Sequence, residues 1–127
     1  AEELKIMLGS ASVEKAQGSM QVRGRDMVTG LPRVVEVPAK EIAVAMSEII
    51  HQILDAVKDV LEQTPPEISA DVIDHGIVLT GGGAMLRHLA EMISKETQVP
   101  AFVANDPLDC VALGTGAILA NPSLMKK

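Results

Sequence analysis

The strongest constraint on this chain is a run of glycines at the end of a β-type segment. Residues 77–80, Ile-Val-Leu-Thr, have the branched and apolar character of a strand, and Gly81, Gly82 and Gly83 follow at once. Glycines remove every Cβ where the strand turns into a helix, so the backbone can lie flat against a ligand and point free N–H groups at it. The pattern predicts either a nucleotide contact or a tight turn without a ligand, because glycine runs also serve as plain turns.

The second half of the chain predicts the order β-α-β-α. After a short helical turn at 68–73, we expect a strand at 77–80, a helix from about 84 to 96, a strand at 101–104 and a helix to about 119. Asp106 is predicted to cap the last helix, with Pro107 at its first position. This order is typical of an α/β fold with parallel strands and helices packed on them.

The first half predicts helices around a β-hairpin. Apolar residues at helical spacing indicate a helix over 1–8 that ends at Gly9. Valines on both sides of Thr29-Gly30-Leu31-Pro32 predict a hairpin over 20–37 with that tetrapeptide as its turn. A continuous apolar stripe over 39–63 predicts a long amphipathic helix, which Thr64-Pro65-Pro66-Glu67 ends.

Composition excludes several classes of function. The 127 residues are 47% hydrophobic but include one aromatic residue, Phe102, which argues against base stacking on single-stranded nucleic acid. The net charge is −6 without a basic cluster, so nucleic acid and anionic lipid are poor partners. A single cysteine, Cys110, rules out an internal disulfide, and no apolar run approaches ~18 residues.

Other glycine-rich nucleotide motifs fit poorly. A dinucleotide-binding motif matches at Gly81 and Gly83 but lacks its third glycine, since position 86 is Leu, and Asp106 is explained as a helix cap. A phosphate-binding loop would need Lys and Ser or Thr where Arg87 and its neighbours stand. We find no pattern of His, Cys and carboxylate typical of a catalytic or metal site, so no catalytic and no metal-binding residue is predicted.

Several motifs together resemble one family. The chain is similar to the C-terminal part of the MreB family, the bacterial actin homologues that determine rod shape. The resemblance covers nearly the whole chain, in order and at natural spacing. It is carried by residues 77–84, Glu96-Thr97, Pro100, Asp106-Pro107-Leu108, Val22-Arg23-Gly24-Arg25-Asp26, Thr29-Gly30-Leu31-Pro32 and Thr64-Pro65-Pro66-Glu67.

The resemblance implies an actin-like α/β fold of the ribonuclease H-like superfamily, with ATP between two large halves. This chain would be a fragment comprising most of the second large domain, with residues 1–64 as an outer small subdomain and residues 65–127 as the inner, nucleotide-contacting one. The family's phosphate-binding loops, catalytic carboxylate and membrane-binding segments are expected upstream of Ala1.

The resemblance also implies the site. Gly81, Gly82, Gly83 and Ala84 match the segment that contacts the adenosine of ATP or ADP, with Met85 at its edge. The opening segment Glu2-Glu3-Leu4-Lys5 matches one in which Glu2 and Lys5 face the adenine and ribose. The spacing of three puts these two side chains on one helix face, which on the residues alone also suits an exposed ion pair.

The function implied is that of an ATP-binding, filament-forming cytoskeletal protein that organises cell-wall synthesis. The intact protein would be a slow ATPase that uses Mg with its nucleotide. It would lie in the cytoplasm at the inner face of the plasma membrane, and its partners would be further copies and membrane proteins of the elongation machinery, with membrane contact through missing regions only. Two alternatives stay open: another ATPase of the superfamily, such as a sugar kinase or an Hsp70-type chaperone, and an interaction module that binds no nucleotide.

Overall fold

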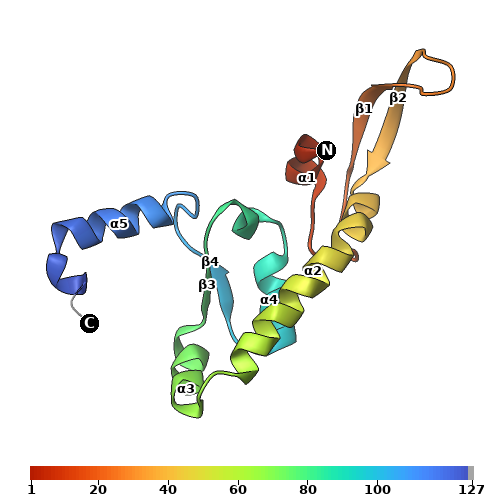
Figure 1. Cartoon of the computed structure of the whole chain (residues 1–127). Coiled ribbons are helices and arrows are strands. Elements are labelled where there is room, and N and C mark those ends of the chain that lie inside the picture. The colour runs from red at the N-terminus through yellow and green to blue at the C-terminus, as the bar shows by residue number, and fades with distance from the viewer. Residues whose placement is uncertain (126–127) are drawn as a thin grey trace.

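The chain folds around one long helix, as the computed structural model in Figure 1 shows for residues 1–125. This helix, α2 (Ala39–Glu62), has the hairpin at its first end and α3 (Pro66–His75) at its last. Helix α1 (Glu2–Leu8) lies beside the start of α2, and α5 (Cys110–Ala120) projects away from the middle. Lys126 and Lys127, the last residues of the predicted inner subdomain, lie outside the described residues.

The hairpin is confirmed, but its turn is not the predicted tetrapeptide. Strands β1 (Ser19–Arg25) and β2 (Pro32–Pro38) pair antiparallel, from Ser19 opposite Pro38 to Arg25 opposite Pro32. Pro32 opens β2 because a proline is tolerated at the first residue of a strand. The connecting loop covers 26–31 and is held by Asp26, whose Oδ1 accepts the N–H groups of Val28 and Thr29 at 2.8 and 3.0 Å.

Helix α2 matches its prediction closely, but its apolar stripe is wider than its buried face. Ala39, Ala43, Ile50 and Leu54 are buried. Ile49 and Ile53 remain 57% and 40% exposed. The stripe therefore covers the core and a second, accessible surface.

The glycines lead into a short turn instead of the predicted helix from Ala84. A 3₁₀ turn, η1 (Gly82–Met85), follows them, and α4 begins at Leu89 and ends at Thr97. Two backbone breaks separate the pieces: Leu86 is extended, with ψ 124°, and His88 has a left-handed φ of 65°. Neither conformation continues a helix, so the prediction was wrong about where this helix begins.

The two predicted parallel strands are confirmed. Strand β3 (Ile77–Leu79) pairs in parallel with β4 (Ala101–Val103), and Ile77 lies opposite Ala101. Helix α4 connects them and packs against β4. The carboxyl end of β3 therefore leads into the glycines, as the sequence pattern predicts.

The last helix differs from its prediction in start and in packing. Asp106 has a φ of 47°, and its backbone oxygen accepts the N–H of Asp109 at 2.9 Å, which closes a turn. Pro107 lies in this turn and is not helical, and α5 begins at Cys110. Every residue of α5 from Val111 to Ala120 is exposed, as is the 3₁₀ turn η2 (Pro122–Met125). Two strands lie ~4.8 Å apart and a helix is ~10 Å across, so a sheet of this width offers α5 little surface.

The core lies between α2 and α4. Its buried members are Ala11, Ile50, Leu54, Leu89 and Ile93, and Ile93 is only 1% exposed. Ala11, Ile50 and Leu54 belong to the predicted outer subdomain and Leu89 and Ile93 to the inner one, so this cluster draws on both. Among the helices of residues 1–125, none combines the length and apolar character needed to cross a bilayer.

Candidate functional site

A cavity of about 970 Å³ lies between the first two helices and the glycines. Small-molecule sites commonly occupy ~300–1,000 Å³, so the space suffices for a nucleoside with part of its phosphates. Helix α1 lines it with Glu2 and Lys5, and α2 lines it with Ile49 and Ile53. The opposite side consists of the end of β3 and residues 82–87.

The structure brings the two predicted site segments to this one cavity. The predicted residues that line it are Glu2, Lys5, Gly82, Gly83, Ala84 and Met85. Leu4 lines a smaller groove of about 290 Å³ between α1 and α2, which Glu2 and Lys5 share. Glu3 is exposed and lines neither space, and Gly81 is not a lining residue although its neighbours Thr80 and Gly82 are.

The glycine segment, Gly81–Met85, leaves free space at the cavity. Gly81 has φ 83°, a conformation that favours glycine, and its N–H donates to Pro107 O at 2.7 Å. A Cβ at Gly83 would meet no atom within 4 Å, and one at Gly82 would touch only Leu108 Cδ2, at 3.5 Å. Within residues 1–125 no bulky side chain fills this position, which leaves the backbone open to a flat group.

The polar side chains of the cavity lie on both of its sides, and two of them, on α1, form an ion pair. Lys5 Nζ lies 2.7 Å from Glu2 Oε1, with side chains 49% and 73% exposed. Thr80 and Arg87 add a hydroxyl and a guanidinium on the other side. A carboxylate can accept hydrogen bonds from sugar hydroxyls, while the aliphatic residues of α2 suit the face of a base.

Sequence reasoning missed part of the lining. Ile49, Ile53 and Leu108 contribute apolar surface, and Arg87 contributes charge. The signal for the isoleucines was present, because the stripe on α2 has more apolar residues than one buried face needs. Within residues 1–125 no group of three or more His, Cys, Asp or Glu side chains is placed to hold a metal ion.

A charged pair links α2 to α4. Lys58 Nζ lies 2.8 Å from Glu96 Oε2. The hydrogen bond from Lys58 lowers the pKa of Glu96, and the same bond raises the pKa of Lys58. Both side chains are more than a third exposed, so solvent weakens the interaction.

Comparison with known proteins agrees with this architecture. The sequence model of the MreB/Mbl protein family matches residues 1–127. The cell shape-determining protein Mbl of Bacillus subtilis is 46% identical over 127 residues, which are 100% of this chain and 38% of Mbl. The chain thus spans well under half the length of that relative.

Solved structures show the same fold. The crystal structure of MreB5 of Spiroplasma citri bound to ADP superposes with a TM-score of 0.86 at 34% identity, covering 98% of this chain and 37% of that chain. The MamK double helical filament matches with a TM-score of 0.66 at 21% identity, over 84% of this chain and 32% of that one. The fold is therefore actin-like, as predicted.

Proposed function

Because this chain belongs to the MreB/Mbl protein family, we propose that it is the adenosine-contacting part of an ATP-binding, filament-forming bacterial protein that determines cell shape. The observation that carries the proposal is the shared cavity: the α1 residues and the glycine segment lie far apart in sequence yet line the same space. MreB5, which has this fold, is bound to ADP in its crystal structure. We assign residues 1–64 to the outer subdomain and residues 65–127 to the inner one.

We assign the nucleotide contacts as follows. Glu2 and Lys5 hydrogen-bond the ribose and the edge of the adenine. Glu3 and Leu4, which lie between them in α1, complete the segment that contacts the nucleotide. Gly81, Gly82, Gly83 and Ala84 pass under the adenosine, with Met85 at its edge. Mg and the groups that hydrolyse ATP belong to the remaining length of the intact protein, which acts as a slow ATPase. Helix α5 also fits a place against other parts of the intact protein, because a helix that is apolar all round is normally covered.

We propose self-association head to tail. The exposed hairpin has Met27 at its tip and carries Arg23, Arg25 and Arg33. Helix α3, at the other end of α2 in Figure 1, carries Glu67, Asp71 and Asp74. Opposite charges at opposite ends favour a heterologous contact, which builds open filaments when the repeated operation does not close. The structure of MamK, which shares the fold, is a double helical filament.

Sedimentation at rising concentration tests this contact. Arg33→Glu is expected to weaken association, and adding Asp71→Arg to restore it. If Arg33→Glu leaves association unchanged, the hairpin is not part of the contact between copies.

In the cell we place the filament in the cytoplasm at the inner face of the plasma membrane. There it guides wall synthesis with membrane proteins of the elongation machinery, and it reaches the membrane through regions outside this chain.

An NMR titration with ADP tests the nucleotide site. Amide shifts are expected at Glu2–Lys5 and Gly81–Met85. The affinity should be weak, because the nucleotide is expected between two large domains and this chain supplies only part of one of them. Gly83→Val should abolish them, because Gly83 lines the cavity and a valine there covers the bare backbone that the adenosine is proposed to contact. Gly24→Val is the matched control: a Cβ there also meets nothing within 4 Å, but it lies in β1. A flat response of the unmodified chain would favour a module that binds no nucleotide.

A further inference from the structure

We propose that Ser10, Arg87 and His88 are positioning residues for nucleotide binding. They hold α1 and the glycine segment at a set separation, so that both sides of the cavity bind the nucleotide as one unit. The inference rests on the proposed function and concerns residues outside its predicted contacts. It comes from the way the chain continues after each side of the cavity.

The two segments that leave the cavity run side by side. Ser10, two residues beyond α1, and Arg87, two residues beyond η1, form a parallel β-bridge, and Ala11 N–H donates to Arg87 O at 2.9 Å. The guanidinium of Arg87 donates to Met7 O, in the last turn of α1. This contact gives a carbonyl at the C-terminal end of α1 a charged donor, so Arg87, which follows the glycine segment, caps α1.

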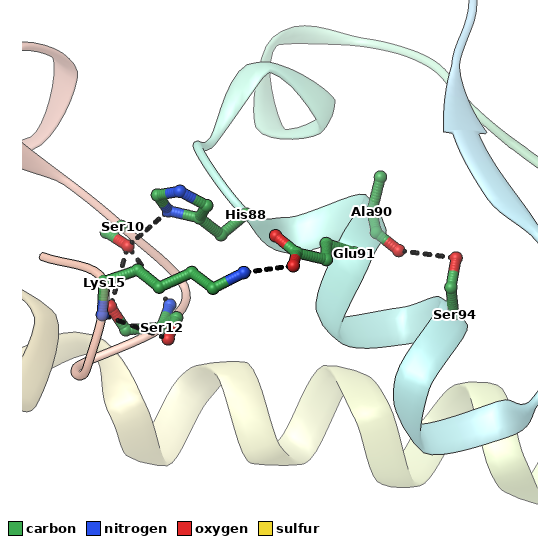
Figure 2. A network of polar contacts seen from close by, with 7 residues as sticks. All are labelled: Ser10, Ser12, Lys15, His88, Ala90, Glu91 and Ser94. Carbon is green, nitrogen blue, oxygen red and sulfur yellow. Dashed lines mark hydrogen bonds and ion pairs between the residues drawn. The ribbon is translucent and has the colours of Figure 1, made fainter.

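Ser10 makes this junction specific. Ser10 is 3% exposed, and Figure 2 shows its hydroxyl between Ser12 and His88. The hydroxyl donates to Ser12 O at 2.8 Å and lies 2.9 Å from His88 Nδ1. With the hydroxyl proton on Ser12 O, His88 Nδ1–H is the donor to Ser10 Oγ. A buried hydroxyl with two partners holds both segments more firmly than an exposed one.

The backbone at His88 supports a positioning role. His88 has φ 65° and ψ 5°, a left-handed conformation uncommon for residues other than glycine. This turn aims the imidazole at Ser10 while α4 starts in a new direction. Such conformations persist where the surroundings demand them and gather at ligand sites.

A second, exposed link lies beside the first. Lys15 pairs with Glu91 in the first turn of α4, which lowers the pKa of Glu91 chiefly through the hydrogen bond from Lys15 (Figure 2). Both side chains are about half exposed, at 51% and 57%. Because solvent screens exposed pairs, we expect the buried junction to set the spacing and the ion pair to add little. The ion pair is therefore a matched control in the same loop.

The test is ADP affinity, measured by NMR titration, in Ser10→Ala, His88→Gly and their double variant. Glycine accepts the left-handed φ, so His88→Gly removes the imidazole and keeps the turn. We expect each single variant to bind ADP ~3–10-fold more weakly, about the effect of one hydrogen bond. At saturating ADP, shifts should persist at Gly81–Met85 and shrink at Glu2–Lys5. The double variant should bind no more weakly than the weaker single one, because both remove the same bond. Lys15→Ala should stay within about twofold of the unmodified chain.

The outcomes separate the two proposals. Unchanged affinity in both single variants, with native amide spectra, overturns the positioning role and leaves the proposed function intact. A uniform loss of shifts on both sides at saturating ADP, or global unfolding of His88→Gly, also overturns it, because the role would then be structural only. If the unmodified chain shows no ADP shifts, the proposed function fails and this inference fails with it.

Discussion

Gly76→Ala is predicted to be among the most damaging single-methyl changes in this chain. Gly76 ends α3 and precedes β3, with φ 79° and ψ −179°. A Cβ there would lie 2.7 Å from Pro100 O and 3.2 Å from Phe102 Cε1. Pro100 O cannot move away freely, because it accepts Ile77 N–H at 2.7 Å and so sets the start of the β3–β4 pair.

The size of the effect follows from two terms. A non-glycine residue held in this backbone region costs about 1–3 kcal/mol. Moving Pro100 O to relieve the contact weakens a hydrogen bond worth about 0.5–1.5 kcal/mol. We therefore expect Gly76→Ala to lower the free energy of unfolding by roughly 2–4 kcal/mol, a large part of the stability of a small domain.

Urea unfolding followed by circular dichroism measures this change, and Gly114→Ala is the control. Gly114 lies within α5, where a Cβ would meet nothing within 4 Å. Alanine there should leave stability unchanged or raise it by about 0.5–1 kcal/mol, because it favours the helix. A Gly76→Ala variant within about 0.5 kcal/mol of the unmodified chain would refute the strain and contact argument, since that is the size of a neutral surface change. Equal losses in both variants would refute it too.

Three further predictions concern packing and charge. Ile93→Ala should lower the free energy of unfolding by about 2–5 kcal/mol, since Ile93 is 1% exposed in the core; a loss below 1 kcal/mol in urea would mean that the core collapses around the gap. Hydrogen bonds from the amides of Thr29 and Val28 lower the pKa of Asp26. The stability that ionised Asp26 contributes to the hairpin should therefore be complete above the ordinary aspartate pKa, about 3.9, and be lost as pH falls through the lowered folded pKa. Protection of the Val28 amide from hydrogen exchange should show this pH dependence in the unmodified chain and not in Asp26→Asn. Glu96→Gln should slightly lower the free energy of unfolding between about pH 4.3 and 10.4, where Glu96 and Lys58 are both charged. The difference in the urea midpoint between this variant and the unmodified chain should shrink in 1 M salt, and a difference that salt does not change would point to packing instead.

The sequence alone determined the elements whose signals are local. The stripe of α2, the prolines after it, and the short strand before the glycines each depend on neighbours along the chain, so periodicity and turn chemistry predict them. The fold class followed from the β-α-β-α order, and the family from motifs in order. The residues proposed as nucleotide contacts were also named from sequence, through the resemblance.

Only the tertiary structure decided the geometry around those residues. No local pattern predicts that His88 turns left-handed, because its conformation comes with Ser10, which lies far away in sequence. For the same reason α4 begins at Leu89, and Ile49 faces a cavity although its pattern is typical of a core. Contacts between distant segments carry free energies that local propensities do not contain, so they decide where helices start and which apolar residues stay exposed.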